Sequence, residues 1–224
     1  MRLPDGVPVR LVLADDEPLL RRGLRVLLEV DGRVEVVGEA ADGAGLLDAV
    51  RRHRPDVALV DVQMPGMDGL SALRALLAWS NPPAVAVLTT FDLDDYVTTA
   101  LDLGAQGFLL KDAEPDALIR AVVDLSSGGA VLDPRITARL LPKLRGAGRL
   151  RDNPHLSALS ARERQVLALI ANGQSNSTIA GELGLSEATV KSYVSTVLTK
   201  LGVENRVQAA LVAHQVGGTW SSSS

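Results

Sequence analysis

The chain has 224 residues, of which 46% are hydrophobic, so it is long enough for two modest packed domains. It has no cysteine, which excludes disulfides, thiolate metal sites and cysteine nucleophiles, and no apolar run is long enough to span a bilayer or resembles a signal peptide. Residues 1–132 hold 12 basic and 21 acidic residues, whereas 133–156 hold 6 and 2 and 157–224 hold 5 and 4, which indicates two regions with different partners.

The first 130 residues alternate between strand and helix patterns. Apolar runs typical of buried strands are each followed by a segment with apolar residues at helical spacing. The expected strands are 9–14, 34–40, 57–61, 84–90 and 107–110, and the expected helices are 18–30, 45–53, 69–79, 94–104 and 114–129. This order predicts an α/β fold, a doubly wound, flavodoxin-like (βα)5 domain whose ligands sit beyond the carboxyl ends of parallel strands.

The second half has a different pattern. Residues 131–156 predict a basic linker with a short helix that meets Pro142 and Gly146. From residue 157 onward all periodicity is helical, which predicts an all-α, four-helix domain over 157–217. The expected helices are 160–173, 176–184, 185–202 and 204–217, and the tail 218–224 is expected to be disordered. Ser160 and Glu163 have the spacing of a capping box at the first of these helices.

Polar side chains stand at the ends of four predicted strands. Asp15 and Asp16 follow the first strand, Asp61 ends the third, Thr89 lies at the end of the fourth, and Lys111 follows the fifth. Parallel strands end at one edge, so three carboxylates would converge there, and either one is protonated or a cation such as Mg²⁺ neutralises them. With a fixed charge from Lys111 and a hydroxyl from Thr89, the set suits a phosphoryl group on Asp61. Taken alone, the two adjacent acids would favour a helix-capping turn before Pro18.

Four motifs together resemble the receiver domain of two-component response regulators, over roughly residues 8–130. They are DD at 15–16, DVQMPGMDG at 61–69, LTTF at 88–91 and GFLLKD at 107–112. Any one of these motifs is weak evidence, but their joint spacing is specific. The resemblance implies that Asp61 accepts a phosphoryl group from a sensor histidine kinase.

The same resemblance implies a cofactor and a switch. The cofactor would be Mg²⁺, held by Asp15, Asp16, Asp61 and the backbone carbonyl of Gln63. Thr89 and Phe108 would form the switch pair, in which the threonine moves toward the phosphate and the aromatic ring fills the space that it leaves. Such a protein is no enzyme in the usual sense, because the receiver catalyses only its own phosphorylation and dephosphorylation.

Residues 159–210 resemble the LuxR-type DNA-binding domain, and a receiver followed by this domain is the NarL/FixJ family. The second and third helices then form a helix-turn-helix, whose second helix enters the major groove. The DNA contacts implied by the resemblance are Thr189, Lys191, Ser192, Ser195, Lys200 and Ser175. The last helix would supply a dimer face through Val207, Leu211 and Val212, although their spacing is equally typical of core. Since the domain holds only five basic residues, we expect tight binding to double-stranded DNA by a homodimer on two half-sites.

These patterns favour a cytoplasmic, DNA-binding response regulator without a membrane partner, whose phosphorylation promotes dimerisation and promoter binding. The main alternative is a transcription factor with a degenerate receiver, controlled by a ligand or partner, and the intact acidic set argues against it. An aspartate-nucleophile phosphatase would need a second carboxylate where this chain has Gln63. A ligand-sensing LuxR-type regulator would need an apolar pocket, whereas residues 1–130 fit a packed domain.

Overall fold

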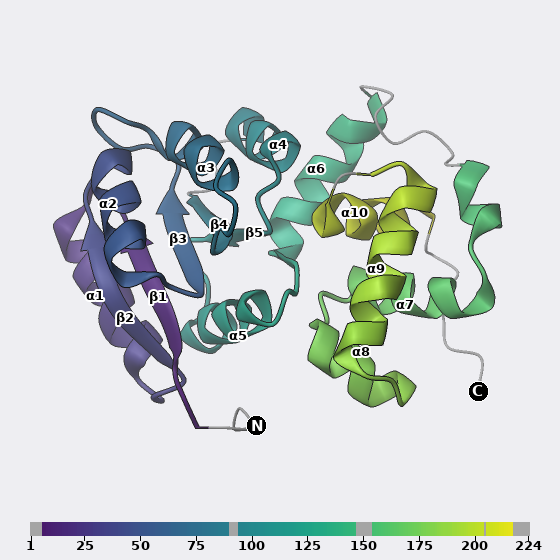
Figure 1. The fold of residues 1–224 in the computed structure, drawn as a ribbon. Helices are drawn as coiled ribbons and strands as arrows, with labels where there is room; N and C mark the ends of the chain where they lie inside the picture. The colour runs from purple at the N-terminus through teal and green to yellow at the C-terminus, as the bar shows by residue number, and fades with distance from the viewer. Residues whose placement is uncertain (1–5, 90–93, 147–153, 204, 217–224) are drawn as a thin grey trace. The chain divides into compact units, whose positions relative to one another are not determined.

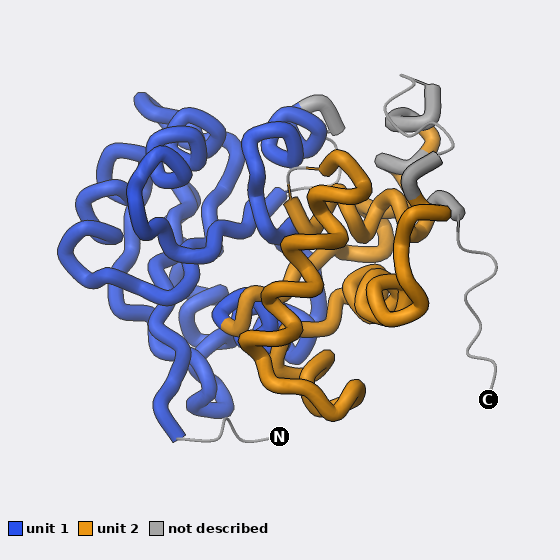
Figure 2. Tube along the Cα trace, turned by 45° about the vertical axis from the view of Figure 1, so that its right-hand side comes forward, with its two compact units in different colours: residues 1–126 blue, residues 127–224 orange. Residues whose placement is uncertain are grey.

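The computed structural model describes residues 6–89, 94–146, 154–203 and 205–216. The chain divides into two compact units, Met1–Ser126 and Ser127–Ser224 (Figure 2). Thr90 and Phe91, residues 147–153 of the predicted linker and the predicted tail lie outside the described residues. No helix in the described part of the chain is long and apolar enough to cross a membrane.

The first unit is a parallel sheet between two layers of helices (Figure 1). Its strands are β1 (Val9–Ala14), β2 (Val34–Ala40), β3 (Val57–Asp61), β4 (Ala84–Thr89) and β5 (Gly107–Leu110), in the order β2-β1-β3-β4-β5. Its helices are α1 (Pro18–Glu29), α2 (Gly43–His53), α3 (Gly69–Leu77), α4 (Asp94–Leu103) and α5 (Pro115–Ser126). Helices α1 and α5 pack together on one face of the sheet, and α2, α3 and α4 cover the other. The predicted α/β fold is therefore confirmed.

The strand order places the site at one edge of this sheet. Strands β1 and β3 are neighbours, and their pairing runs to Ala14 and Val60, so Asp15 and Asp61 follow side by side. All four neighbouring pairs in this unit are parallel, and β3 to β5 are buried almost completely because helices cover both faces. The order reverses direction between β1 and β3, which is where ligands bind in doubly wound sheets.

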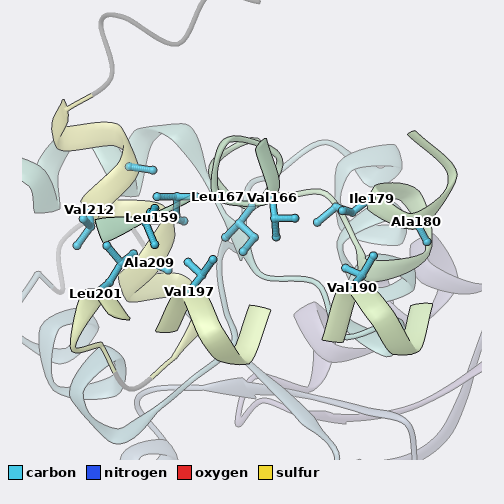
Figure 3. Packing of buried hydrophobic residues seen from close by; sticks show 13 residues of the cluster. Leu159, Val166, Leu167, Ile179, Ala180, Val190, Val197, Leu201, Ala209 and Val212 are labelled. Atoms are coloured by element: carbon cyan, nitrogen blue, oxygen red, sulfur yellow. The ribbon is translucent and has the colours of Figure 1, made fainter. Parts of the chain in front are cut away.

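The second unit is mostly helical. It comprises β6 (Val131–Leu132), α6 (Pro134–Gly146), the 3-10 helix η1 (Pro154–Ala158), α7 (Ala161–Ala171), α8 (Asn176–Leu183), α9 (Glu187–Leu201) and α10 (Arg206–Val216). Side chains from α7, α8, α9 and α10 point toward one another and form the core (Figure 3). The capping box at Ser160 and Glu163 is confirmed, since each side chain accepts a hydrogen bond from the backbone of the other.

Helix α6 is longer than the sequence suggested. It runs for 13 residues and continues through Pro142, whereas the sequence predicted only a short helix within a linker. Proline removes the N–H that would bond to the carbonyl of Ala138. Ala138 is exposed, so water can satisfy that carbonyl and the helix tolerates the proline.

Candidate functional site

A buried lysine joins two of the predicted acids at the carboxyl edge of the sheet. Lys111 Nζ lies 2.7 Å from Asp61 Oδ2 and 2.9 Å from Asp15 Oδ2. Asp15 and Asp61 are 0% and 4% exposed. Glu17 is a more distant neighbour, with its Oε1 3.5 Å from the ammonium. The site therefore holds more negative than positive charge with little water to screen it.

The electrostatics reflect this imbalance. Burial raises the pKa of Asp61 above its ordinary 3.8, Lys111 opposes that rise, and the neighbouring Asp15 adds to it. Burial alone would lower the pKa of Lys111, but hydrogen bonds and charge attraction from Asp61 and Asp15 raise it above 10.5. Both pKa values can be raised at once. The Lys111 ammonium is stabilised by several carboxylates, whereas burial destabilises the charged form of Asp61 more than one ammonium stabilises it.

The acids fit a divalent cation. Asp15, Asp16 and Asp61 each offer a carboxylate oxygen, and these oxygens lie within 4.8 Å of one another. Asp15 Oδ2 is buried, and its one described close partner is the Lys111 ammonium at 2.9 Å. A buried oxygen in that state has a lone pair available to a metal. Asp16 and Gln63 are exposed, so the open side of the cluster can admit an ion with its waters.

Two glycines hold the loop after Asp61 close to the sheet. A Cβ at Gly69 would lie 2.0 Å from the carbonyl oxygen of Asp61, so only glycine fits there. A Cβ at Gly43 would lie 2.6 Å from Cγ of Met67, and the N–H of Gly43 donates to the Met67 carbonyl at 2.9 Å. The N-terminus of α2 therefore holds the loop that follows the candidate phosphoacceptor Asp61.

The predicted switch residues lie on neighbouring strands. Thr89 is 2% exposed and Phe108 is fully buried. Phe108 pairs with Val87, two residues before Thr89, which places both side chains on the same face of the sheet one pair apart. This arrangement suits the expected exchange of space between them, and the switch itself stays a prediction.

Helices α8 and α9 form the predicted helix-turn-helix. Ser186 caps α9 by accepting a hydrogen bond from the N–H of Thr189 at 3.2 Å. The predicted base-edge and phosphate contacts Lys191, Ser192 and Ser195 are exposed at spacings of one, three and four residues, so they share one face. Thr189 is exposed in the first turn of the same helix. Val190, Val197 and Leu201 are buried on the opposite side, in the core.

Comparison with known proteins matches each unit to one family. Residues 11–123 match the response regulator receiver domain, and residues 157–213 match the bacterial regulatory proteins of the luxR family. The chain is 43% identical over 213 residues to a probable transcriptional regulatory protein NarL of Mycobacterium tuberculosis, covering 95% of this chain and 97% of the relative. The chain belongs to the NarL/LuxR family of two-component response regulators.

Solved structures of similar regulators support the same conclusion. The response regulator ChrA of a heme-sensing two-component system is 38% identical, with a TM-score of 0.54 over 93% of this chain and 98% of its own. A structure of two RcsB dimers bound to two parallel DNAs is 29% identical, with a TM-score of 0.56 over 93% of this chain and 99% of its own. The expected combination of a receiver and a LuxR-type DNA-binding domain is confirmed.

Two predicted DNA contacts of this response regulator are engaged within the chain. Lys200 Nζ lies 2.8 Å from Glu163 Oε2 and donates to the carbonyl of Ala158 at 3.2 Å. Ser175 is 2% exposed, and its hydroxyl accepts the N–H of Thr178 at the start of α8. Both groups would have to give up these partners to meet a phosphate, so their role in DNA binding is not favoured by this structure and stays a prediction.

The predicted dimer face is covered in the single chain. Val207, Leu211 and Val212 are 0%, 1% and 4% exposed. Val212 packs within the core shared by α7 to α10 (Figure 3). For Val212 the core interpretation, which the sequence left open, is the simpler one. A second copy could reach the other two only after α10 is uncovered, and the dimer face stays a prediction.

Sequence reasoning missed a buried arginine in the second unit. Arg206 at the start of α10 donates to the carbonyl of Gly128 at 3.1 Å and to Asn176 Oδ1 at 2.6 Å, and also to the carbonyl of Gln174. Gly128 has a φ of +73°, and a Cβ there would lie 2.9 Å from Asn176 Nδ2. One guanidinium thus ties α10 to the turn before α8 and to the segment that follows α5. No local sequence period could reveal a contact that spans 78 residues.

Proposed function

We propose that a sensor histidine kinase phosphorylates Asp61 with the aid of Mg²⁺. Phosphorylation then promotes homodimerisation and sequence-specific binding to promoter DNA, which controls transcription. The observation that carries the proposal is the contact of 2.7 Å between Lys111 Nζ and Asp61 Oδ2, beside Asp15 and Asp16 in a buried edge of the sheet. The membership of the chain in the response regulator family supports it.

The chain's own residues would share the work of phosphoryl transfer. A carboxylate oxygen of Asp61 forms the new O–P bond while the N–P bond of the kinase phosphohistidine breaks. Lys111 holds one oxygen of Asp61 in place and neutralises charge that develops on the transferring group. The N–H of Gln63 donates to the other oxygen at 3.4 Å, so Lys111 does not hold that oxygen. Burial raises the pKa of Asp61 and so favours its protonated form, and Lys111 opposes that rise and so favours the ionised nucleophile.

Asp15, Asp16, Asp61 and the backbone carbonyl of Gln63 would hold the metal ion. When bound, Mg²⁺ supplies positive charge that the site lacks and orients the phosphoryl oxygens. The buried Oδ2 of Asp15, whose one described close partner is Lys111, is the feature of this chain that supports the assignment. The receiver would then catalyse only its own phosphorylation and dephosphorylation.

The signal would leave the site through the switch pair. Thr89 would turn toward the phosphoryl group, and Phe108 would fill the space left behind, which repacks the face formed by α4, β5 and α5. The phosphoryl group shifts a population between two states rather than creating a new one. The dimer would bind DNA with the exposed face of α9, where Lys191, Ser192 and Ser195 lie. Two copies on two half-sites compensate for the few basic residues of one domain.

The test is an intact-mass measurement of the full chain after incubation with phosphoramidate and Mg²⁺. We expect a gain of one phosphoryl group in the wild type and none in Asp61→Asn. Sedimentation should then show a shift toward dimer, and DNA binding should tighten, for the phosphorylated protein only. If the folded wild type gains no phosphoryl group, the proposal is wrong and control by a ligand or partner takes its place.

A further inference from the structure

Arg21 on α1 reaches the backbone of the acidic loop. Its Nη1 donates to the carbonyl oxygen of Asp15, and its Nε lies 3.2 Å from Glu39 Oε2 on β2. The Arg21 side chain is 17% exposed, so both contacts are largely shielded from water. The guanidinium therefore links the turn after β1 to a neighbouring strand of the sheet.

Glu39 is well placed to hold this arginine. It lies in β2 opposite Leu13 of β1, and the next residue, Ala40, accepts the N–H of Asp15 at 3.1 Å. Burial opposes the ionisation of Glu39, but Arg25 and Arg21 lower its pKa below the ordinary 4.5. Glu39 thus stays charged near neutral pH and anchors Arg21 to a rigid strand.

The carbonyl that Arg21 holds belongs to the peptide between the two acids. That peptide plane fixes how Asp16 leaves the sheet relative to Asp15. A second contact closes the turn from the other side, because the N–H of Glu17 donates to Asp15 Oδ1 at 2.8 Å. Ligands held in place by neighbouring hydrogen bonds bind a metal more tightly than ligands that must be ordered on binding.

We propose that Arg21 is a positioning residue for the Mg²⁺ site, fixing the peptide that joins Asp15 to Asp16. This inference rests on the proposed function of the acidic cluster. The sign of the effect separates positioning from simple electrostatics. A cation near a metal site repels the metal, so an electrostatic role predicts tighter Mg²⁺ binding once Arg21 is removed. Positioning predicts weaker binding.

Arg25 provides a matched control. It lies one turn further along α1 and shares Glu39, with its Nη1 2.8 Å from Glu39 Oε1. It also pairs with Glu29 at 3.3 Å, and none of its described contacts is to the acidic loop. Arg21→Ala and Arg25→Ala therefore remove the same charge and the same partner, and only the first removes the bond to the Asp15 carbonyl.

The experiment is a calorimetric Mg²⁺ titration of the full-length wild type and of both variants. We expect affinity to fall about tenfold in Arg21→Ala and by less than twofold in Arg25→Ala. In phosphorylation with phosphoramidate, the Mg²⁺ concentration that gives half the maximal rate should rise in Arg21→Ala by the same factor as the affinity falls. The rate at saturating Mg²⁺ should be unchanged. Glu39→Gln, which keeps Arg21 but loosens its anchor, should give an intermediate Mg²⁺ affinity and serves if Arg21→Ala does not fold.

Equal or tighter Mg²⁺ binding in Arg21→Ala than in Arg25→Ala overturns the positioning role. A wild type that neither binds Mg²⁺ nor gains a phosphoryl group overturns the proposed function instead. Arg21→Lys adds a further check, because a lysine can donate to the Asp15 carbonyl but cannot bridge to Glu39 with a second arm. It should recover part of the lost affinity.

Discussion

The two units each contain a lysine in close contact with a carboxylate, and the two pairs behave in opposite ways. Lys111 lies 2.7 Å from Asp61 in the first unit, and Lys200 lies 2.8 Å from Glu163 in the second. The pKa of Asp61 is raised, mainly by burial, whereas hydrogen bonds from Lys200 and from the Ser160 backbone lower that of Glu163. Contact distance alone therefore says little about what an ion pair does.

The surroundings explain the difference. Asp61 ends a buried strand beside Asp15, so its charge is costly and a single ammonium does not balance the site. Glu163 lies in the first turn of α7, where the helix dipole and a backbone N–H favour its charge. The ion pair between Asp61 and Lys111 therefore leaves a carboxylate that a cation or a reaction partner can still stabilise. The pair of Glu163 and Lys200 is already satisfied and joins α7 to α9.

The largest effect should come from removing the buried cation. Lys111→Met leaves Asp61 and Asp15 uncompensated, and we expect the free energy of unfolding of the first unit to fall by about 3 kcal/mol at pH 7.5 without Mg²⁺. The pKa of Lys111 is raised on folding, so its contribution is fully present below 10.5 and is lost only as pH rises through the higher folded value. Urea unfolding followed by Trp79 fluorescence, in a Trp220→Phe background, measures it.

The control for this measurement is the addition of Mg²⁺. The ion should restore part of the stability lost in Lys111→Met, because it neutralises the same carboxylates. A loss below about 1 kcal/mol in Lys111→Met would contradict the view that this lysine balances the buried acids.

A smaller effect of opposite sign is expected at Asp61. Because folding raises the pKa of Asp61, its charged form opposes folding, and Asp61→Asn should raise the free energy of unfolding at neutral pH, by less than the loss expected for Lys111→Met. The wild type should regain this difference as pH falls through the folded pKa and then below 3.8, where the acid is neutral in both states. The same Trp79 fluorescence assay, run without Mg²⁺ as a function of pH, measures the difference, and a less stable Asp61→Asn at pH 7.5 would refute the expected sign.

The smallest effect is expected in the second unit. Glu163→Gln keeps the capping geometry but loses the charge that meets Lys200, so α7 and α9 should exchange amide hydrogens faster. The pKa of Glu163 is lowered on folding, so its contribution is present above 4.5 and is lost as pH falls through the folded value. Hydrogen exchange read by mass spectrometry measures this, and Lys200→Met should match Glu163→Gln. Unequal effects of the two variants on exchange would show that the ion pair between Glu163 and Lys200 does not account for the protection of α7 and α9.

Much of the fold was readable from local patterns. The strands Val9–Ala14, Val34–Ala40, Val57–Asp61 and Gly107–Leu110 have the predicted bounds, because apolar runs and flanking turns specify buried strands. Helix α2 begins at Gly43 rather than at residue 45, since Asp42 caps it by accepting the N–H of Gly45. Asp15, Asp61 and Lys111 lie together as expected, because the carboxyl ends of parallel strands meet at one edge of the sheet.

The contacts that the sequence could not predict join side chains that are far apart along the chain. Arg21 and Arg25 are four residues apart in a helix and therefore share a face, but nothing local indicates that both meet Glu39. The LuxR-type resemblance implied a phosphate contact for Lys200, and only the packing of α9 reveals its partner Glu163. Side chains that join separate elements follow tertiary geometry, and no residue spacing encodes them.

The bond between Arg206 and the Gly128 carbonyl has a consequence for studying the halves separately. A fragment that begins at residue 157, where the luxR-family match starts, keeps Gln174 and Asn176 but lacks that carbonyl. A fragment that begins at Ser127 keeps every described acceptor of Arg206. Affinities measured on the shorter piece therefore describe a helix-turn-helix released from an upstream anchor, and they do not transfer directly to the intact regulator.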